Sequence, residues 1–155
     1  MNEGTVEERL AALGLTLPPP GEATGLFVKY VQTGNLLFLS GSGADQPGYT
    51  APKGKVGATV TLEQAKEAAR YTALNLLATA KEALGSLERV HRVVKLLGMV
   101  NCVPEFGDTP QVINGCSEVF VAAFGDAGRH ARSAVGFVTL PGQMPVEIEA
   151  IFEVA

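Results

Sequence analysis

The sequence predicts an α+β domain in which two helices pack on one face of a mixed β-sheet. Strand-like runs are rich in β-branched or alternating apolar residues, and two longer segments repeat apolar residues at helical spacing. These segments follow one another in the order β-β-α-β-α-β-β, which favours helices gathered on one side of the sheet. The chain has 155 residues, and a chain of this size buries roughly 70% of its unfolded surface, which suits one core.

The N-terminal segment is expected to form an arm outside that domain. Apolar spacing predicts a short helix over 6–13, and the consecutive prolines at 18–20 fit neither a helix interior nor a sheet interior. We therefore expect a helical arm and a proline-rich connector over 1–25, followed by a single domain over 26–155.

A β-hairpin is predicted to open the domain. Its strands are expected at 27–32 and 36–40, with Gly34 and Asn35 as the tight turn. Turn-forming residues dominate 42–59, which is typical of a loop at the rim of a site. This loop lacks the pattern G-x-x-x-x-G-K-[ST], and its glycines do not lead directly into a helix, so phosphate binding is not expected.

A long helix is predicted over 61–84, with Thr61 as the N-cap residue and Gly85 at its end. Its inner face carries small and leucine side chains at helical spacing: Leu62, Ala65, Ala69, Ala73, Leu76, Leu77, Ala80 and Leu84. Small residues on that face allow the helix to lie close to a sheet. The next segment, 87–103, is rich in β-branched valine and is predicted as a long strand.

A second helix is predicted over 108–125. Either Asp108 or Thr109 is expected to cap it, and Pro110 suits its first turn. Its inner stripe consists of apolar residues at helical spacing: Val112, Val119, Phe120 and Ala123.

Two further strands are predicted at 133–140 and 146–154. The last one places Val146, Ile148, Ala150, Phe152 and Val154 on one face and Glu147, Glu149, Ile151 and Glu153 on the other. Because both helices cover one face of the sheet, a monomer would expose the half-apolar other face to water. This exposure, with a charged fraction of only 18%, predicts a homo-oligomer.

Composition argues against several kinds of partner. The net charge is −4 and no two of the 12 Lys and Arg residues are adjacent, so neither nucleic acid nor an anionic membrane is an expected partner. The N-terminus lacks the basic start and apolar core of a signal peptide, and no apolar run approaches the length of a membrane span. A cytoplasmic protein is expected.

The cysteines and histidines form no metal-binding or redox pattern. Cys102 and Cys116 are too far apart for a C-x-x-C pair and are expected to be packing thiols. His91 and His130 have no histidine at i, i+4 and no cluster of acidic residues around them. We expect no metal.

The C-terminal segment ARSAVGFVTLPGQMPVEIEAIFEV, with GNLLFLSG and INGCSEVF, resembles the YjgF/RidA family, also called L-PSP endoribonuclease-like. The most specific part of the resemblance is the Arg-Ser-x-Val strand, the Leu-Pro turn and the Glu-x-Glu-Ala strand. It extends from about Phe27 to the C-terminus. It implies a chorismate-mutase-like fold, a homotrimer with sites in clefts between subunits, and no metal or organic cofactor.

The resemblance also implies an activity, since deaminases of the family hydrolyse reactive 2-imino acids and enamines to 2-keto acids and ammonia. Arg132 matches the arginine that clamps the substrate carboxylate, and Glu147 matches the acid that handles water. The other pocket residues implied by the motif are Ser40, Gly41, Asn114 and Phe27. Phe27 stands where the deaminases carry a tyrosine, so any hydroxyl contact from that position is missing.

The chemistry of these residue types suits that assignment. A planar guanidinium offers a carboxylate two parallel N–H donors, and an imine carbon needs only a positioned water and a proton acceptor. Each residue also has a structural alternative. Arg132 could pair with Glu147 or Glu149, Glu147 could simply lie on a solvated face, Ser40 could bond its own turn, and Asn114 could bond within its helix.

Two other functions stay open at this point. A small-carboxylate binding or regulatory trimer is favoured by the Phe27 departure. Ribonuclease action is suggested only by the alternative family name, and an acidic chain without a basic stripe is a poor RNA ligand. Chorismate mutase activity would be an analogy from the fold alone.

Overall fold

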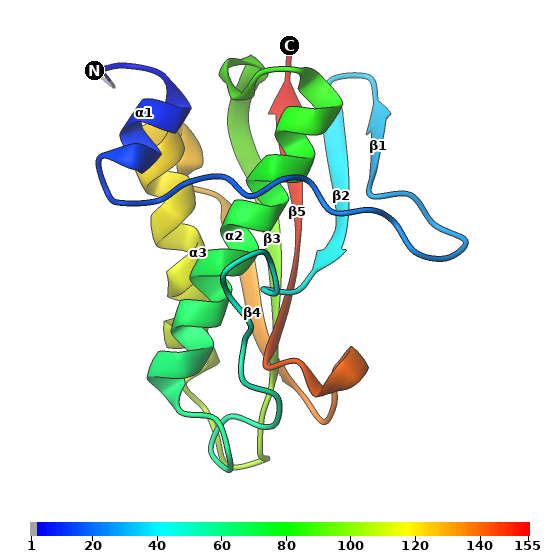
Figure 1. Cartoon of the computed structure of the whole chain (residues 1–155), viewed down its shortest axis with the longest axis vertical. Coiled ribbons are helices and arrows are strands. Elements are labelled where there is room, and N and C mark those ends of the chain that lie inside the picture. The colour runs from blue at the N-terminus through cyan, green and yellow to red at the C-terminus, as the bar shows by residue number, and fades with distance from the viewer. Residues whose placement is uncertain (1–2) are drawn as a thin grey trace.

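A five-stranded sheet with helices on one face makes up the two layers of the computed structural model, which describes residues 3–155 (Figure 1). The helices are α1 (Val6–Ala11), α2 (Leu62–Leu84) and α3 (Thr109–Phe124). The strands are β1 (Tyr30–Thr33), β2 (Leu36–Ser42), β3 (Val90–Asn101), β4 (Ala131–Phe137) and β5 (Val146–Val154). Short 3-10 turns lie at Leu87–Arg89, Gly125–Gly128 and Pro141–Gln143.

The sheet is mixed, as the sequence predicts. Its order is β1-β2-β5-β3-β4; β3 and β4 run parallel and the other neighbours are antiparallel. Chain-adjacent β1 and β2 form the predicted hairpin, closed by a two-residue turn with a positive φ of 57° at Gly34. The predicted α+β class and element order are therefore confirmed.

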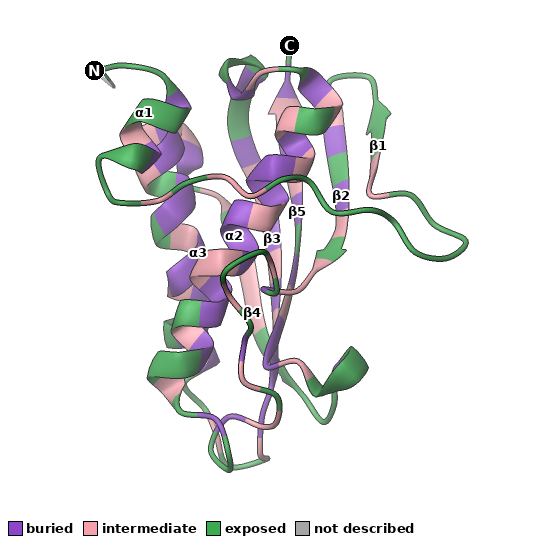
Figure 2. Ribbon diagram, viewed as in Figure 1, coloured by how far each residue is buried: buried purple, intermediate pink, exposed green. Residues whose placement is uncertain are grey.

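The core lies between the sheet and the layer formed by α2 and α3 (Figure 2). The helix faces predicted to point inward are buried, apart from the partly buried Leu62, and β5 alternates as predicted, with Val146, Ile148 and Phe152 fully buried. Cys102 and Cys116 are both free and buried, in agreement with a packing role.

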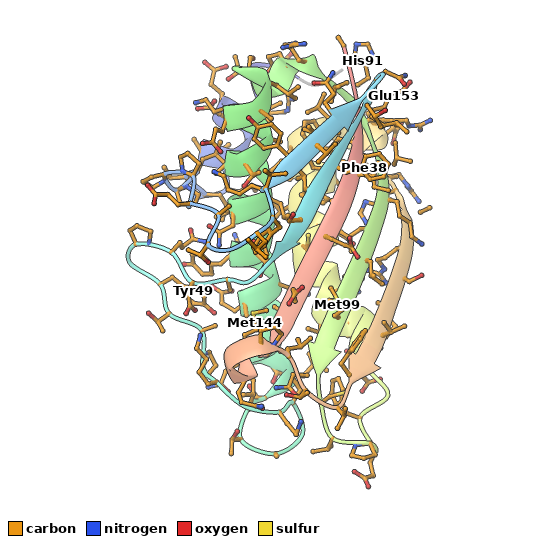
Figure 3. All side chains as sticks on the ribbon, turned by 90° about the vertical axis from the view of Figure 1, so that its right-hand side faces the viewer. Phe38, Tyr49, His91, Met99, Met144 and Glu153 are labelled. Atoms are coloured by element: carbon orange, nitrogen blue, oxygen red, sulfur yellow. The ribbon has the colours of Figure 1, made fainter. Side chains whose placement is uncertain are left out.

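The opposite face of the sheet carries no helix, and Figure 3 looks toward it with α3 behind the strands and α2 to their left. Large apolar side chains from β1, β2 and β4 are 40–54% exposed there: Val31, Phe38, Val135 and Phe137. The homo-oligomer that would cover this face remains a prediction. No helix within residues 3–155 is both long and apolar enough to span a membrane.

Several predicted boundaries are wrong. The strand predicted over 87–103 covers only Val90–Asn101, because Leu87–Arg89 form a 3-10 turn before it. The first strand begins at Tyr30 instead of Phe27, because its ladder with β2 ends at the Tyr30–Leu39 pair. The strand predicted over 133–140 starts earlier and ends at Phe137, where its partner β3 ends at Asn101. The short first helix stops at Ala11.

Helix α1 packs on the rest of the fold through Val6 and Leu10, which belong to the common core. Arg9 fixes it further by donating from Nε and Nη2 to the carbonyl of Ala123 at 2.9 and 2.6 Å. The following connector then crosses over α2 to reach β1 (Figure 1).

The long loop between β2 and α2 has little regular structure but is anchored to α2. Tyr49 stacks on Tyr71 of the helix, with ring centroids 3.7 Å apart and an interplanar angle of 11°. Asn75 donates from Nδ2 to the carbonyls of Gly43 and Asp45 at 2.9 and 3.2 Å. The loop therefore has a defined place beside the hairpin end.

Two glycines set the position of α3. An added Cβ at Gly98 of β3 would lie 2.5 Å from Ile113, and one at Gly115 of α3 would lie 2.1 Å from the carbonyl oxygen of Lys66 in α2. The helix is therefore held at close range against both the sheet and α2.

The start of α2 is capped as the sequence predicts. Thr61 accepts from the backbone N–H of Gln64 at 3.1 Å, and the Gln64 side chain accepts from the N–H of Thr61 at 3.0 Å, a complete capping box. In α3, Asp108 takes the N-cap position without a side-chain bond, while the Thr109 hydroxyl donates to the carbonyl of Ala134 at 2.9 Å.

Replacing Thr61 with alanine is expected to lower the free energy of unfolding by about 1 kcal/mol, because it removes the acceptor for one N–H of the first turn. Urea unfolding measures the change. Thr61→Ser keeps the acceptor and should retain nearly all of the stability, so equal losses in the two variants would contradict the capping role.

Candidate functional site

Arg132 lies on the edge strand β4, and its side chain reaches toward α3. Its Nη1 donates to Asn114 Oδ1 at 2.8 Å and to Ser117 Oγ at 3.1 Å, which uses both hydrogens of that nitrogen. Within residues 3–155, Nε and Nη2 make no hydrogen bond. The guanidinium is thus fixed through one nitrogen and presents its Nε–Nη2 edge. The two N–H groups on this edge are spaced to match the two oxygens of a carboxylate.

The charge of Arg132 has no counter-ion in the described part of the chain. The four ion pairs within residues 3–155 involve lysines, and none includes Arg132. The alternative that Arg132 pairs with Glu147 or Glu149 is therefore wrong within one chain. A half-buried cation without a partner is costly, so this position favours the arrival of an anion.

Asn114 serves Arg132 directly. Its Oδ1 accepts from the guanidinium instead of bonding within its own helix, so the local alternative for Asn114 is wrong. Its placement follows from the close approach of α3 to its neighbours through Gly98 and Gly115.

A serine and a histidine extend this group of side chains. Ser117 lies one helical turn after Asn114, and its Oγ is 2.9 Å from Nε2 of His130. The other ring nitrogen, Nδ1, is 2.7 Å from the carbonyl of Gly128. Burial, with a contribution from the nearby Arg132, lowers the pKa of His130. The sequence analysis considered His130 only as a metal ligand and did not identify Ser117. Two spacings could have revealed them: Ser117 lies three residues after Asn114 in the predicted helix, and His130 lies two residues before Arg132.

Glu147 lies on β5 and faces the side of the sheet that carries no helix. It is paired in register with Met99 of β3, whose side chain Figure 3 shows on the same face. An added Cβ at Gly41 would lie 2.3 Å from Glu147 Oε2, so a side chain at this position would require the carboxylate to move from its present place. Burial first, and then the charge of Glu149, raise the pKa of Glu147.

The raised pKa makes the stability of the protein depend on pH in a defined direction. Between the ordinary and the raised pKa of Glu147, the folded state binds more protons than the unfolded state, so stability falls as pH rises through this window. Glu147→Gln should therefore be more stable than the parent protein at pH 7, with a difference that shrinks toward acid pH. Urea unfolding across this range tests it, and a difference independent of pH would contradict it.

Ser40 and Gly41 form a β-bulge at the end of β2. Between the Leu39–Ala150 and Ser42–Ile148 pairs, these two residues stand opposite one residue of β5. The Ser40 hydroxyl donates to the carbonyl of Val28 at 2.6 Å, across to the segment before β1 and not within its own turn. Its lone pairs stay available to accept a hydrogen bond.

Ser40 and Gly41, together with Phe27, line a surface cavity of about 330 Å³. Residues 21–24 of the connector and the start of the long loop form other parts of its wall. Phe27 lies just before β1 and is 56% exposed. Lys53 and Asp45, which also line the cavity, pair with each other at 2.7 Å.

The predicted site residues therefore form two groups in one chain. Arg132 and Asn114 lie between β4 and α3, on the helix side of the sheet. Glu147, Gly41, Ser40 and Phe27 gather around the end of β2, which β5 and β3 separate from β4. A single chain does not bring the two groups together. No group of three or more His, Cys, Asp or Glu side chains in residues 3–155 is arranged to hold a metal ion.

Comparisons with known proteins agree with the sequence resemblance. Protein TCP17 of Trypanosoma cruzi is 38% identical over 151 residues, which span 97% of this chain and 94% of that protein. The crystal structure of Atu1372 from Agrobacterium tumefaciens, a protein of unknown function, is 43% identical with a TM-score of 0.90 over 97% of this chain and 92% of that one.

Structures of more distant proteins share the fold. RidA from an Antarctic Psychrobacter species is 28% identical, with a TM-score of 0.60 over 88% of this chain and 94% of that one. Escherichia coli TdcF, solved with bound serine, is 23% identical with a TM-score of 0.63 over the same shares. The family model described as "YjgF/chorismate mutase-like, putative endoribonuclease" matches residues 7–148. With most of its length matched, the chain belongs to this YjgF/chorismate mutase-like family, which includes RidA.

Proposed function

We propose that the protein hydrolyses small 2-imino acids, or the enamines from which they form, to 2-keto acids and ammonia. The observation that carries the proposal is the half-buried Arg132, which has no carboxylate partner in residues 3–155, is fixed through Nη1, and keeps its Nε–Nη2 edge free. That edge would bind the substrate carboxylate by two charge-assisted hydrogen bonds. The serine bound to TdcF, which also carries a carboxylate, is consistent with a ligand of this class.

In the proposed reaction, a water oxygen adds to the imine carbon while Glu147 accepts a proton from that water. Glu147 then returns this proton to the nitrogen of the resulting carbinolamine, the C–N bond breaks to release ammonia, and the carboxylate accepts the hydroxyl proton as the carbon keeps the oxygen as a ketone. Water is the only co-reactant that this hydrolysis needs. Glu147 suits proton transfer because its raised pKa brings it closer to neutrality than an exposed glutamate.

A complete site requires a second copy of the chain. Arg132 and Asn114 of one copy would face the group of Glu147, Gly41, Ser40 and Phe27 of another, and the uncovered sheet face would provide the contact. The family resemblance implies a homotrimer, in which each subunit would give one group to each of two sites.

Hydrolysis of an imine released by an amino-acid oxidase tests the proposed activity. The purified protein should accelerate the appearance of the 2-keto acid above the rate in water alone. No acceleration with imines of several amino acids would overturn the proposal. If a 2-keto acid then bound tightly in calorimetry, a small-carboxylate binding module, which the Phe27 departure favours, would be selected instead.

A mixture of two inactive variants tests the shared site. Arg132→Ala and Glu147→Gln should each be inactive alone, because each removes one half of every site. When the two are unfolded together and refolded at equal amounts, about a quarter of the sites in a random cyclic assembly would combine an intact Arg132 with an intact Glu147. A mixture that stays as inactive as its components would exclude a site shared between subunits.

A further inference from the structure

We propose that Ser117 and His130 are positioning residues, which together hold the Arg132 guanidinium so that its Nε–Nη2 edge faces an incoming carboxylate. This inference rests on the proposed role of Arg132 as the carboxylate-binding residue, and it names the side chains that orient its guanidinium. Neither residue is placed to touch the substrate itself, because both lie at the Nη1 side of the guanidinium.

The hydrogen-bond partners fix the direction of each bond. The carbonyl of Gly128 can only accept, so Nδ1 of His130 carries the ring hydrogen and Nε2 is an acceptor. The Ser117 hydroxyl therefore donates to Nε2, and its oxygen is free to accept from Nη1 of Arg132. The chain of bonds runs from Arg132 through Ser117 and His130 to the backbone at Gly128.

The neutral ring is the form that the surroundings favour. Phe120 of α3 packs edge-on against His130, with ring centroids 5.9 Å apart, and Arg132 of β4 is the charge that faces it through Ser117. Asp126 and Arg129, which precede the histidine in the chain, are exposed. Burial and the charge of Arg132 lower the pKa of His130, so that Nε2 remains an acceptor at neutral pH.

The two bonds at Nη1 share the work of orientation. Asn114 and Ser117 lie one turn apart on α3, so together they define the plane of the guanidinium, whereas Asn114 alone would allow it to rotate. His130 keeps the Ser117 hydroxyl hydrogen away from Nη1 by accepting it. Loss of either residue should therefore weaken carboxylate binding without removing any contact to the ligand.

Binding of pyruvate, measured by calorimetry on the assembled protein, tests this role. Ser117→Ala should weaken binding about tenfold, the effect of one hydrogen bond to a charged group, and Ser117→Thr should restore it. His130→Phe, which keeps an aromatic ring against Phe120, should weaken binding about threefold when Ser117 is present. Because His130 acts through Ser117, the double variant should bind no more weakly than Ser117→Ala alone.

Nitrogen NMR of the histidine ring gives a readout that does not depend on a ligand: His130 should be the tautomer with hydrogen on Nδ1. The opposite tautomer, or additive losses in the double variant, would overturn the inference. Equal affinity of the parent protein and of Ser117→Ala for pyruvate would also overturn the inference, while leaving the proposed function intact. Parent protein that neither binds pyruvate nor hydrolyses imines would instead overturn the proposed function, and the role of the positioning residues with it.

Discussion

Replacing Arg132 with lysine is expected to lower kcat/KM for imine hydrolysis by about 100-fold, although the positive charge is kept. Lysine offers one ammonium on a flexible stem and cannot present two parallel N–H donors to a carboxylate. The single ammonium would also have to serve both the ligand and the two acceptors that now hold Nη1, which are Asn114 and Ser117. The loss corresponds to about 2.7 kcal/mol, near that of one charge-assisted hydrogen bond. Steady-state kinetics with an oxidase-generated imine measure it.

The matched control is Arg129→Lys, since Arg129 is exposed and lies just outside β4. It should leave kcat/KM within about twofold of the parent value, as is usual for surface substitutions. Equal activity of the Arg132 and Arg129 variants would show that a charge without bidentate geometry is sufficient, and the clamp would have to be abandoned.

Replacing Gly115 with alanine is expected to destabilise the fold by about 3 kcal/mol, the upper part of the range for overpacking a core. The added Cβ would lie 2.1 Å from the carbonyl oxygen of Lys66, which is backbone and cannot rotate away. Helices α2 and α3 would have to separate. Thermal unfolding should show a midpoint about 6–12 °C lower for a chain of this length.

Gly107→Ala is the control for this substitution, because an added Cβ at Gly107 has no heavy atom within 4 Å. Its unfolding midpoint should stay close to that of the parent protein. An unchanged unfolding midpoint for Gly115→Ala as well would mean that α2 and α3 can separate at little cost in free energy. In that case Asn114 would not be held in place by the contact of its neighbour, Gly115, with α2.

Features that repeat along the chain could be predicted from the sequence. The alternation in β5 and the apolar stripes of α2 and α3 indicate which side of each element is buried, because only one side of each faces the apolar core. Asn114 and Arg132, which the family resemblance implies as pocket residues, are hydrogen-bonded to each other, while their role in a pocket stays a prediction.

Features that depend on contacts between distant segments could not be predicted in this way. The bulge at Ser40 and Gly41 exists only in the register of β2 with β5. Likewise, Ser117 meets His130 only because α3 lies against β4. The strand order could not be predicted from the sequence either, and this order separates Arg132 from Glu147 within a chain.

The anchoring of the long loop on α2 has a consequence for proteolysis. A segment of this length without regular structure is normally where trypsin cuts first, and the loop contains two lysines. Yet Tyr49 is stacked on Tyr71, and Lys55 donates to Asn101 at 2.9 Å and to the carbonyl of Val138. Cleavage after these lysines would require this part of the loop to leave Asn101 and Val138, so it should resist digestion until that opening occurs.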